Sequence, residues 1–216
     1  TDDAEAARDL YALAAQRWAD EGKTRHYVVV PAADAPLLDA WLRLGFGQQH
    51  AVALRKIPDA IAKPQGVRPA EEDDVEALVA LAPLLADHQA LAPVFGPGRT
   101  GWDDEELRRE IVEDVGAGNV LVAERSGELA GAVYLAEREA GLHRPRSAFI
   151  AWAGVVPEAR GGGLGVSLTD ASFAWGRARG YDTIATDWRV TNLLASRFWP
   201  ARGFRTTFLR LYRHIP

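Results

Sequence analysis

The alternation of apolar and polar positions divides the first part of the chain into four short elements. Apolar residues at helical spacing predict a helix over Asp2 to Ala19, and a β-branched run predicts a strand over His26 to Val30. Asp34 can cap a second helix that runs to Leu44, and residues 46–57 are predicted to be extended. The order of this part is therefore helix, strand, helix, strand.

A longer series of strands and helices follows from residue 67 to the end of the sequence. Predicted strands cover residues 67–69, 120–124, 129–137, 148–156, 183–188 and 204 onward. Predicted helices cover residues 71–91, 103–115, 166–179 and 192–202, and residues 92–102 are predicted to form a loop. This alternation predicts an α/β domain.

The first 58 residues align with the last 58 at a constant offset of 158, without a gap. The matches include Leu10 with Leu168, Gly22 with Gly180, Trp41 with Trp199, Gly45-Phe46 with Gly203-Phe204, and Arg55, Ile57 and Pro58 with Arg213, Ile215 and Pro216. Two unrelated helix–strand–helix–strand units are one explanation, and an internal repeat is the favoured one. The sequence thus predicts a partial, degenerate half-repeat over residues 1–58, a linker over 59–66 and the main domain over 67–216.

Composition limits the function classes. Charged residues make up 25% and hydrophobic residues 48% of the chain, as in ordinary globular proteins, and the net charge of −5 argues against a nucleic-acid partner. The absence of cysteine excludes a thiol nucleophile and zinc–thiolate sites, and the histidines lack metal-ligand spacing, so we expect no metal. With no membrane-length apolar run and no signal-peptide pattern, we expect a cytoplasmic protein without a membrane partner.

The most specific local feature is a glycine-rich turn, Pro157 to Gly165, between a predicted strand and a predicted helix. Its four glycines allow positive φ angles and close approach of a ligand. The following helix N-terminus and Arg160 add positive charge, so the turn suits an anion such as a pyrophosphate. The turn lacks the Lys-Ser/Thr of a Walker A loop and the glycine spacing of a dinucleotide fingerprint. A flexible glycine linker is the alternative, which the amphipathic helix after the turn disfavours.

Two stretches of the chain resemble motifs of the GCN5-related N-acetyltransferase (GNAT) family. Val156 to Gly165 resembles the acetyl-CoA motif Arg/Gln-x-x-Gly-x-Gly/Ala, and Asn192-x-x-Ala195-x-x-Phe198-Trp199-x-x-x-Gly203-Phe204 resembles the second signature of the family. The resemblance covers about 150 residues. It implies the α/β GNAT fold, with a mixed central β-sheet flanked by helices, and residues 1–58 look like the back half of a second such domain.

The resemblance also implies how acetyl-CoA would bind. Its pyrophosphate would lie on the backbone N–H groups of Arg160, Gly161, Gly162, Gly163, Leu164 and Gly165. Pantetheine would run along the strand that ends at Val155 and Val156, with Asn192, Ser196 and Trp199 on its other side. The implied activity is acetyl transfer to a primary amine of a small molecule or peptide by direct attack on the thioester. A non-catalytic acyl-CoA-binding module with a regulatory or interaction role is the alternative.

The sequence departs from the family where the chemistry takes place. Trp199 stands where many members have a tyrosine that protonates the departing thiolate, and an indole N–H is not a usable acid. A thiol with a pKa of about 8.5 can leave as the anion. Ser196 is a catalytic candidate that could hold a water near the sulfur, or it is a back-bonded helix serine. Asp187 and Glu137 are candidates for the general base, and an ion-pair role is the alternative for both.

Two further predictions concern the role of two tryptophans and the packing of the half-repeat. Trp152 and Trp188, together with Glu137, are candidates for an acceptor pocket suited to a flat or apolar amine, and core packing is the alternative for the two tryptophans. The half-repeat is too small to be stable alone, so we expect it to pack on the C-terminal domain of the same chain or of a partner in a homodimer.

Overall fold

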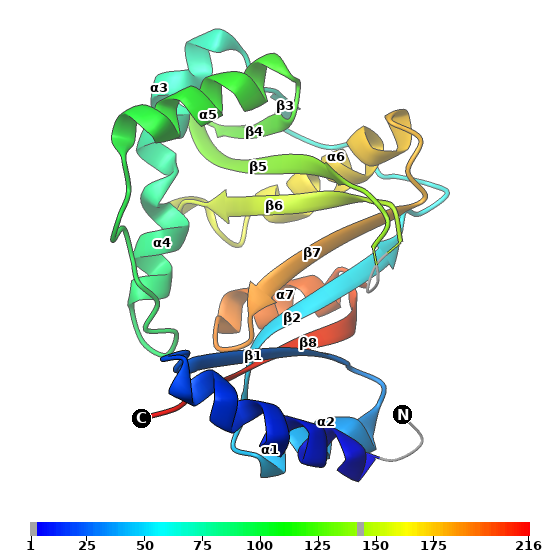
Figure 1. Ribbon diagram of the computed structural model, residues 1–216. Helices are drawn as coiled ribbons and strands as arrows, with labels where there is room; N and C mark the ends of the chain where they lie inside the picture. The colour runs from blue at the N-terminus through cyan, green and yellow to red at the C-terminus, as the bar shows by residue number, and fades with distance from the viewer. Residues whose placement is uncertain (1–3, 142–144) are drawn as a thin grey trace. The chain divides into compact units, whose positions relative to one another are not determined.

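The computed structural model describes residues 4–141 and 145–216 (Figure 1). The chain forms two compact units, of which the first comprises Thr1–Leu54 with Asp187–Pro216 and the second comprises Arg55–Thr186. The boundaries fall within strands β2 (Gly47–Lys56) and β7 (Thr183–Arg189). The first unit therefore combines residues from both ends of the sequence. The domain bounds that the sequence suggests, 1–58, 59–66 and 67–216, concern similarity between stretches of sequence and stay a prediction.

The second unit is built on a mixed β-sheet. Its elements are β3 (Val67–Pro69), the 3-10 turn η1 (Glu72–Asp74), α3 (Val75–Leu81), α4 (Pro83–Ala90), α5 (Asp104–Gly116), β4 (Val120–Arg125), β5 (Glu128–Arg138), β6 (Ser147–Val155), the 3-10 turn η2 (Pro157–Ala159), α6 (Leu164–Ala178) and the first part of β7. The strands follow one another in the order β3-β4-β5-β6-β7. The pairs from β3 to β6 are antiparallel, and β6 and β7 are parallel. The α/β fold with a mixed sheet is thus confirmed.

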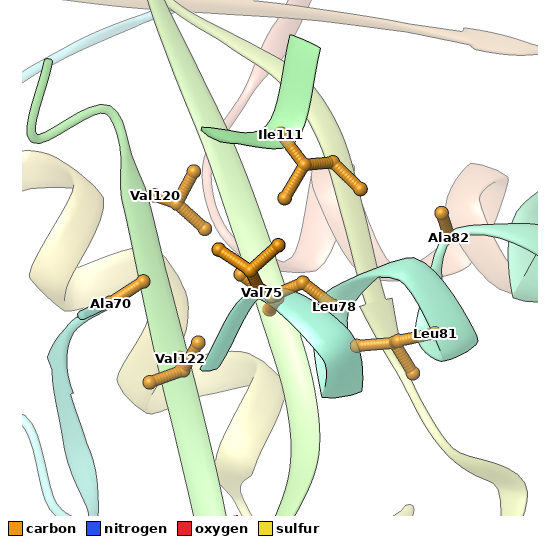
Figure 2. Packing of buried hydrophobic residues seen from close by; sticks show 9 residues of the cluster. Ala70, Val75, Leu78, Leu81, Ala82, Ile111, Val120 and Val122 are labelled. Carbon is orange, nitrogen blue, oxygen red and sulfur yellow. The ribbon is translucent and has the colours of Figure 1, made fainter. Parts of the chain in front are cut away.

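Helices cover both faces of this sheet, with α6 on one side and α3, α4 and α5 on the other (Figure 1). Val120 and Val122 of β4 point to the α3 side, and Leu121 points to the opposite side because side chains alternate along a strand. Figure 2 shows the core on the α3 side, which consists of Ala70, Val75, Leu78, Leu81, Ala82, Ile111, Val120, Val122 and Ala132. A strand buried on both faces explains the unbroken apolar run of β4.

The single helix predicted over residues 71–91 is wrong. The structure has a 3-10 turn followed by two helices that meet at Ala82 and Pro83. Pro83 has no N–H to bond the carbonyl of Val79, so the helical hydrogen-bond ladder cannot continue through it. Pro83 instead occupies the first position of α4, where the missing N–H costs nothing.

The first unit contains the two ends of the chain. Its elements are α1 (Ala4–Asp20), β1 (Arg25–Pro31), α2 (Ala35–Arg43), β2 (Gly47–Lys56), the end of β7, α7 (Leu193–Ala201) and β8 (Arg205–His214). Strand β8 lies between β1 and β2 and is antiparallel to both (Figure 1). The expectation that the N-terminal segment packs on the C-terminal part of the same chain is confirmed. The predicted helix start at Asp2 lies outside the described residues.

The two ends of the chain repeat the same backbone plan. Adding 158 to the bounds of β1, α2 and β2 gives the bounds of β7, α7 and β8. Gly45 and Gly203 end their helices with φ angles of +81° and +80°, a left-handed conformation that favours glycine. Asp34 accepts a hydrogen bond from the N–H of Leu37 as the cap of α2, and Asn192 caps α7 in the same way.

No helix in residues 4–141 and 145–216 is both long enough and apolar enough to cross a lipid bilayer.

We expect deletion of residues 1–58 to destabilise the protein strongly. The deletion removes both neighbours of β8 and leaves its backbone N–H and C=O groups without their strand partners. Thermal unfolding should show a midpoint lowered by more than about 10 °C or no cooperative transition. Leu13→Ala, at a side chain that is 80% exposed, is the control and should change the midpoint by less than about 2 °C. A truncated protein that unfolds at the same midpoint would contradict the prediction that residues 1–58 stabilise the protein.

A half-buried histidine in the β2–β8 ladder predicts a pH dependence of stability. His50 lies opposite Arg210, whose Nη2 is 2.7 Å from Nδ1 of the imidazole. Burial first, and then the positive charges of Arg210 and Arg189, lower the pKa of His50 from 6.5 to about 4. The folded protein therefore resists protonation of His50 over a pH range in which the unfolded chain accepts the proton.

This contribution to stability is present above pH 6.5 and decreases as the pH falls from 6.5 towards 4. We expect His50→Gln to flatten the dependence of the unfolding free energy on pH within that window. Denaturant unfolding at pH 7.5, 6, 5 and 4.5 measures it. Parallel curves for the variant and the parent protein would show that His50 does not carry the effect.

Candidate functional site

Strand β6 has two neighbours at its start and one at its end. It pairs with β5 along its whole length, whereas its parallel pairing with β7 covers Ala148–Ile150 against Ile184–Thr186. Tyr134 lies opposite Trp152 and Leu135 lies opposite Ile150, so Ala151 forms a β-bulge in β6. The pairing with β7 thus ends where the bulge begins, and β6 continues to Val155.

The backbone at the end of β6 is oriented by its bond to β5. The N–H of Val156 donates to the carbonyl of Ala130, at 2.9 Å, and the carbonyl of Val156 accepts from Ala159 at 3.0 Å. Backbone groups of successive strand residues point to opposite edges, so those of Val155 face away from β5. The carbonyl of Val155 accepts a hydrogen bond of 3.0 Å from Nε of Arg160, which keeps this guanidinium at the outer edge of the strand.

The predicted binding roles of Val155 and Val156 are therefore not equivalent. Both backbone groups of Val156 are engaged within the protein, and its assignment to the cofactor stays a prediction. Val155 presents its backbone at the open edge of β6.

The glycine turn after β6 is an open cradle. Gly161 and Gly163 have φ angles of +78° and +85°, which a side chain would strain, and no other described atom lies within 4 Å of the position of a Cβ at either residue. At Gly162 the nearest side-chain atom is Nη1 of Arg125, at 3.8 Å from that position. Arg125 also donates to the carbonyl of Glu158 at 3.3 Å. Two arginines, Arg125 and Arg160, therefore lie beside a turn that has no side chains to fill it.

The N-terminus of α6 adds hydrogen-bond donors to this cradle. The first bond from this helix back to its cap runs from the N–H of Ser167 to the carbonyl of Gly163, at 3.0 Å. The N–H groups of Leu164, Gly165 and Val166 precede it and have no acceptor within the helix. The helix dipole places partial positive charge at the same end. Open glycines, free N–H groups and two guanidinium groups together fit a pyrophosphate.

Aromatic side chains cover β6 on the α3 side of the sheet. Trp152 packs against the core of Figure 2, and its ring lies 5.5 Å from the ring of Tyr134 at an interplanar angle of 80°. The hydroxyl of Tyr134 is buried and has no hydrogen-bond partner among the described residues. Burial, followed by the charge of Asp114, raises the pKa of this phenol. Trp152 therefore packs against the core, which is the alternative to a pocket role. Its assignment to an acceptor pocket stays a prediction.

Glu137 lies at the other end of β5. It pairs with Ala148, whereas Gly131 of the same strand pairs with Val155 beside the glycine turn. Its carboxylate accepts a hydrogen bond of 2.5 Å from the hydroxyl of Tyr181 and lies 3.7 Å from Nε of Arg179. These contacts agree with the ion-pair alternative, and the assignment of Glu137 to a substrate pocket or a base stays a prediction.

The remaining candidates belong to the first unit, where α7 has the same local contacts as α2. Trp199 is 7% exposed and its ring lies 5.1 Å from that of Phe204, as Trp41 lies 5.0 Å from Phe46 in the first copy. The packing of Trp199 thus repeats that of Trp41 in the first copy. The helix-capping role of Asn192 is repeated in the same way.

Ser196, Asp187 and Trp188 stand where the first copy has Leu38, Val29 and Val30. The hydroxyl of Ser196 donates to the carbonyl of Val190 at 2.8 Å, so its lone pairs are left to accept. The side chain of Asp187 is exposed, and Trp188 is buried. The catalytic roles of Ser196 and Asp187 and the pocket role of Trp188 stay predictions.

Sequence reasoning missed three residues of the second unit that bear on the site. Arg125 reaches the glycine turn because β4 and β5 form a hairpin beside it, and only the strand register reveals this. Tyr134 and Gly154 come near Trp152 through the bulge at Ala151. Residues 4–141 and 145–216 hold no group of three or more acidic or histidine side chains that could bind a metal ion.

Comparisons with known proteins place the chain among acetyltransferases. Residues 85–204 match the Acetyltransferase (GNAT) family. Mycothiol acetyltransferase of Thermobispora bispora is 32% identical over 190 residues, which covers 81% of this chain and 61% of that protein. The chain thus spans less than two thirds of the length of this relative.

Solved structures show the same fold at low sequence identity. A GCN5-related N-acetyltransferase from Sphaerobacter thermophilus has a TM-score of 0.64 and 15% identity, over 96% of this chain and 68% of that one. The aminoglycoside N-acetyltransferase AAC(6′)-Iy in complex with CoA has a TM-score of 0.51 and 20% identity, over 65% of this chain and 92% of that one.

Proposed function

Because the chain belongs to the acetyltransferase (GNAT) family, a family of acyltransferases, we propose that it transfers an acetyl group from acetyl-CoA to a primary amine of a small molecule or peptide. The observation that carries the proposal is the open glycine cradle at the end of β6, with Arg160 held against the carbonyl of Val155. The family match over residues 85–204 includes this cradle. A small-molecule acceptor is also supported by the mycothiol acetyltransferase relative. A cytoplasmic location and a homodimer stay predictions.

Acetyl-CoA would be bound mainly through backbone groups. The pyrophosphate would accept hydrogen bonds from the N–H groups at the start of α6, with charge compensation by Arg160 and Arg125. The amides of pantetheine would pair with the outward backbone groups of β6, in the manner of an added strand. Because β6 has no β7 partner in register beyond Ile150, this edge of the second unit suits an extended ligand.

The proposed reaction is direct attack. The neutral amine forms a C–N bond to the thioester carbonyl carbon, the C–S bond then breaks, and the amine proton goes to a base. The thiolate of CoA is a tolerable leaving group because its conjugate thiol has a pKa of about 8.5. A tyrosine acid is thus dispensable, which is consistent with a buried, packed Trp199. Asp187, exposed on β7, remains the base candidate that we propose to test first.

Thiol release from acetyl-CoA across an amine panel tests the function. The panel includes the amine acceptor of mycothiol acetyltransferase, aminoglycosides, aromatic amines, ethylamine and a short peptide. We expect amine-dependent release of CoA and an acetylated product by mass spectrometry. Micromolar binding of CoA with no release for any amine would favour the non-catalytic module instead.

We expect Arg160→Ala to weaken the use of acetyl-CoA because it removes a guanidinium from the cradle. A charge-assisted hydrogen bond contributes about 1.5–3 kcal/mol, so the KM for acetyl-CoA should rise at least about tenfold. Acetyl-pantetheine lacks the pyrophosphate, and its KM should change less than about twofold. Exposed Arg109 of α5 provides the control, Arg109→Ala, which should leave both values unchanged. Equal losses with both thioesters would place the pyrophosphate elsewhere.

A further inference from the structure

The indole of Trp152 lies over Gly154 of its own strand. Both residues point to the α3 side of the sheet because they are two positions apart in β6. A Cβ built on Gly154 would lie 2.6 Å from Cη2 and 3.1 Å from Cζ2 of the Trp152 indole. Distances below 3.0 Å between carbon atoms are not tolerated in packed proteins, so any side chain at residue 154 must displace this ring.

The indole is held in this position from two further directions. Cδ2 of Leu84 in α4 would be 3.1 Å from the same Cβ, so α4 restricts movement of the indole in that direction. The ring of Tyr134 meets the indole edge-on across the β5–β6 pair. A displaced indole therefore changes its contacts with both Leu84 and Tyr134.

Glycine at residue 154 is required by space and not by backbone conformation. Its φ angle is not in the positive range that Gly161 and Gly163 adopt, so an alanine could follow the same backbone path. Gly47 of β2 is the useful contrast, since it has ordinary strand geometry and no described atom within 4 Å of its Cβ position. The distinctive property of Gly154 is thus the ring that lies on it.

From this arrangement we propose that Gly154 is a positioning residue for acceptor specificity: it fixes the indole of Trp152 over β6, and the position of that indole sets which amines fit beside the thioester. The inference rests on the proposed transferase function. Trp152 lies three residues before Val155, beside the stretch of β6 along which pantetheine would run. A displaced indole would contact a bulky amine near the thioester, whereas a small amine would still fit.

The test compares Gly154→Ala with Gly47→Ala in steady-state kinetics. We expect Gly154→Ala to raise the KM of the best ring-bearing amine of the panel at least about fivefold, the effect of overpacking by one methyl group. The KM values of ethylamine and acetyl-CoA should change less than about twofold, and Gly47→Ala should change none of the three. An unchanged KM for the ring-bearing amine, or equal increases for both amines, would overturn the proposal.

A second variant separates positioning from damage to the fold. In a Trp152→Phe background the outer ring is absent, so the addition of Gly154→Ala should raise the KM of the ring-bearing amine less than about twofold. A full fivefold effect in that background would show that the substitution acts by another route and would overturn the proposal.

A ¹⁹F NMR measurement reports the position of the Trp152 indole without an enzyme assay. With 5-fluorotryptophan incorporated, the ¹⁹F resonance of Trp152 is assigned by its loss in Trp152→Phe. It should move in Gly154→Ala and stay in place in Gly47→Ala. If no amine supports thiol release, the transferase proposal fails and specificity has no meaning, yet the resonance still decides whether Gly154 positions the indole. An unmoved resonance overturns the inference even if transfer is found.

Discussion

The end of the parallel pairing at Ile150 is the constraint on which the site of the second unit depends. A strand whose neighbour is missing presents backbone donors and acceptors that require another partner. Beyond Ile150, β6 keeps β5 on one side, bulges at Ala151 and runs on to Val155. The carbonyl of Val155 is already satisfied by Arg160, which converts the last backbone group of the strand into the anchor of a positive charge. Only the 3-10 turn η2 (Pro157–Ala159) separates the strand edge from the arginine and the glycine cradle.

In the first unit, the β2–β8 strand pair is symmetric with respect to the repeat: the offset of 158 converts one strand into the other. In the β2–β8 register, Gly47 pairs with Tyr212 and Leu54 pairs with Arg205, and the offset of 158 exchanges these two pairs. The pair of Ala51 with Leu209 maps onto itself. Each copy therefore contributes one strand to a shared pair of strands, and neither copy completes its sheet from its own residues. The His50–Arg210 contact breaks this symmetry, because the related positions are Phe208 and Val52.

Much of the fold could be predicted from the sequence, because local signals marked the elements. Glycines at helix ends and an Asp or Asn cap placed α2 and α7 within a residue or two, and the repeat made one copy a check on the other. The break at Pro83 was missed because an apolar helical pattern continues across it. The glycine turn was found because close approach of a ligand leaves a local trace in residue type.

Contacts between residues that lie far apart in the sequence could not be predicted from residue types. The hydrogen bond from Tyr181 to Glu137 spans 44 residues, and the approach of Arg125 to Glu158 spans 33. Both depend on strand register, which shifts between Ala123 and Glu124 in β4 and at Ala151 in β6. A candidate list drawn from residue types alone therefore named Glu137, whose carboxylate is engaged, and passed over Gly154, which has no functional group.

The matching contacts of Trp41 and Trp199 have a consequence for how such chains are compared. A search that rewards the capped helix, the tryptophan and the Gly-Phe pair will find this pattern twice in one polypeptide. The second occurrence follows a strand that ends in a glycine cradle. The shared pattern therefore does not by itself mark a copy that binds acetyl-CoA, and the proposed pyrophosphate site lies in the glycine turn before α6.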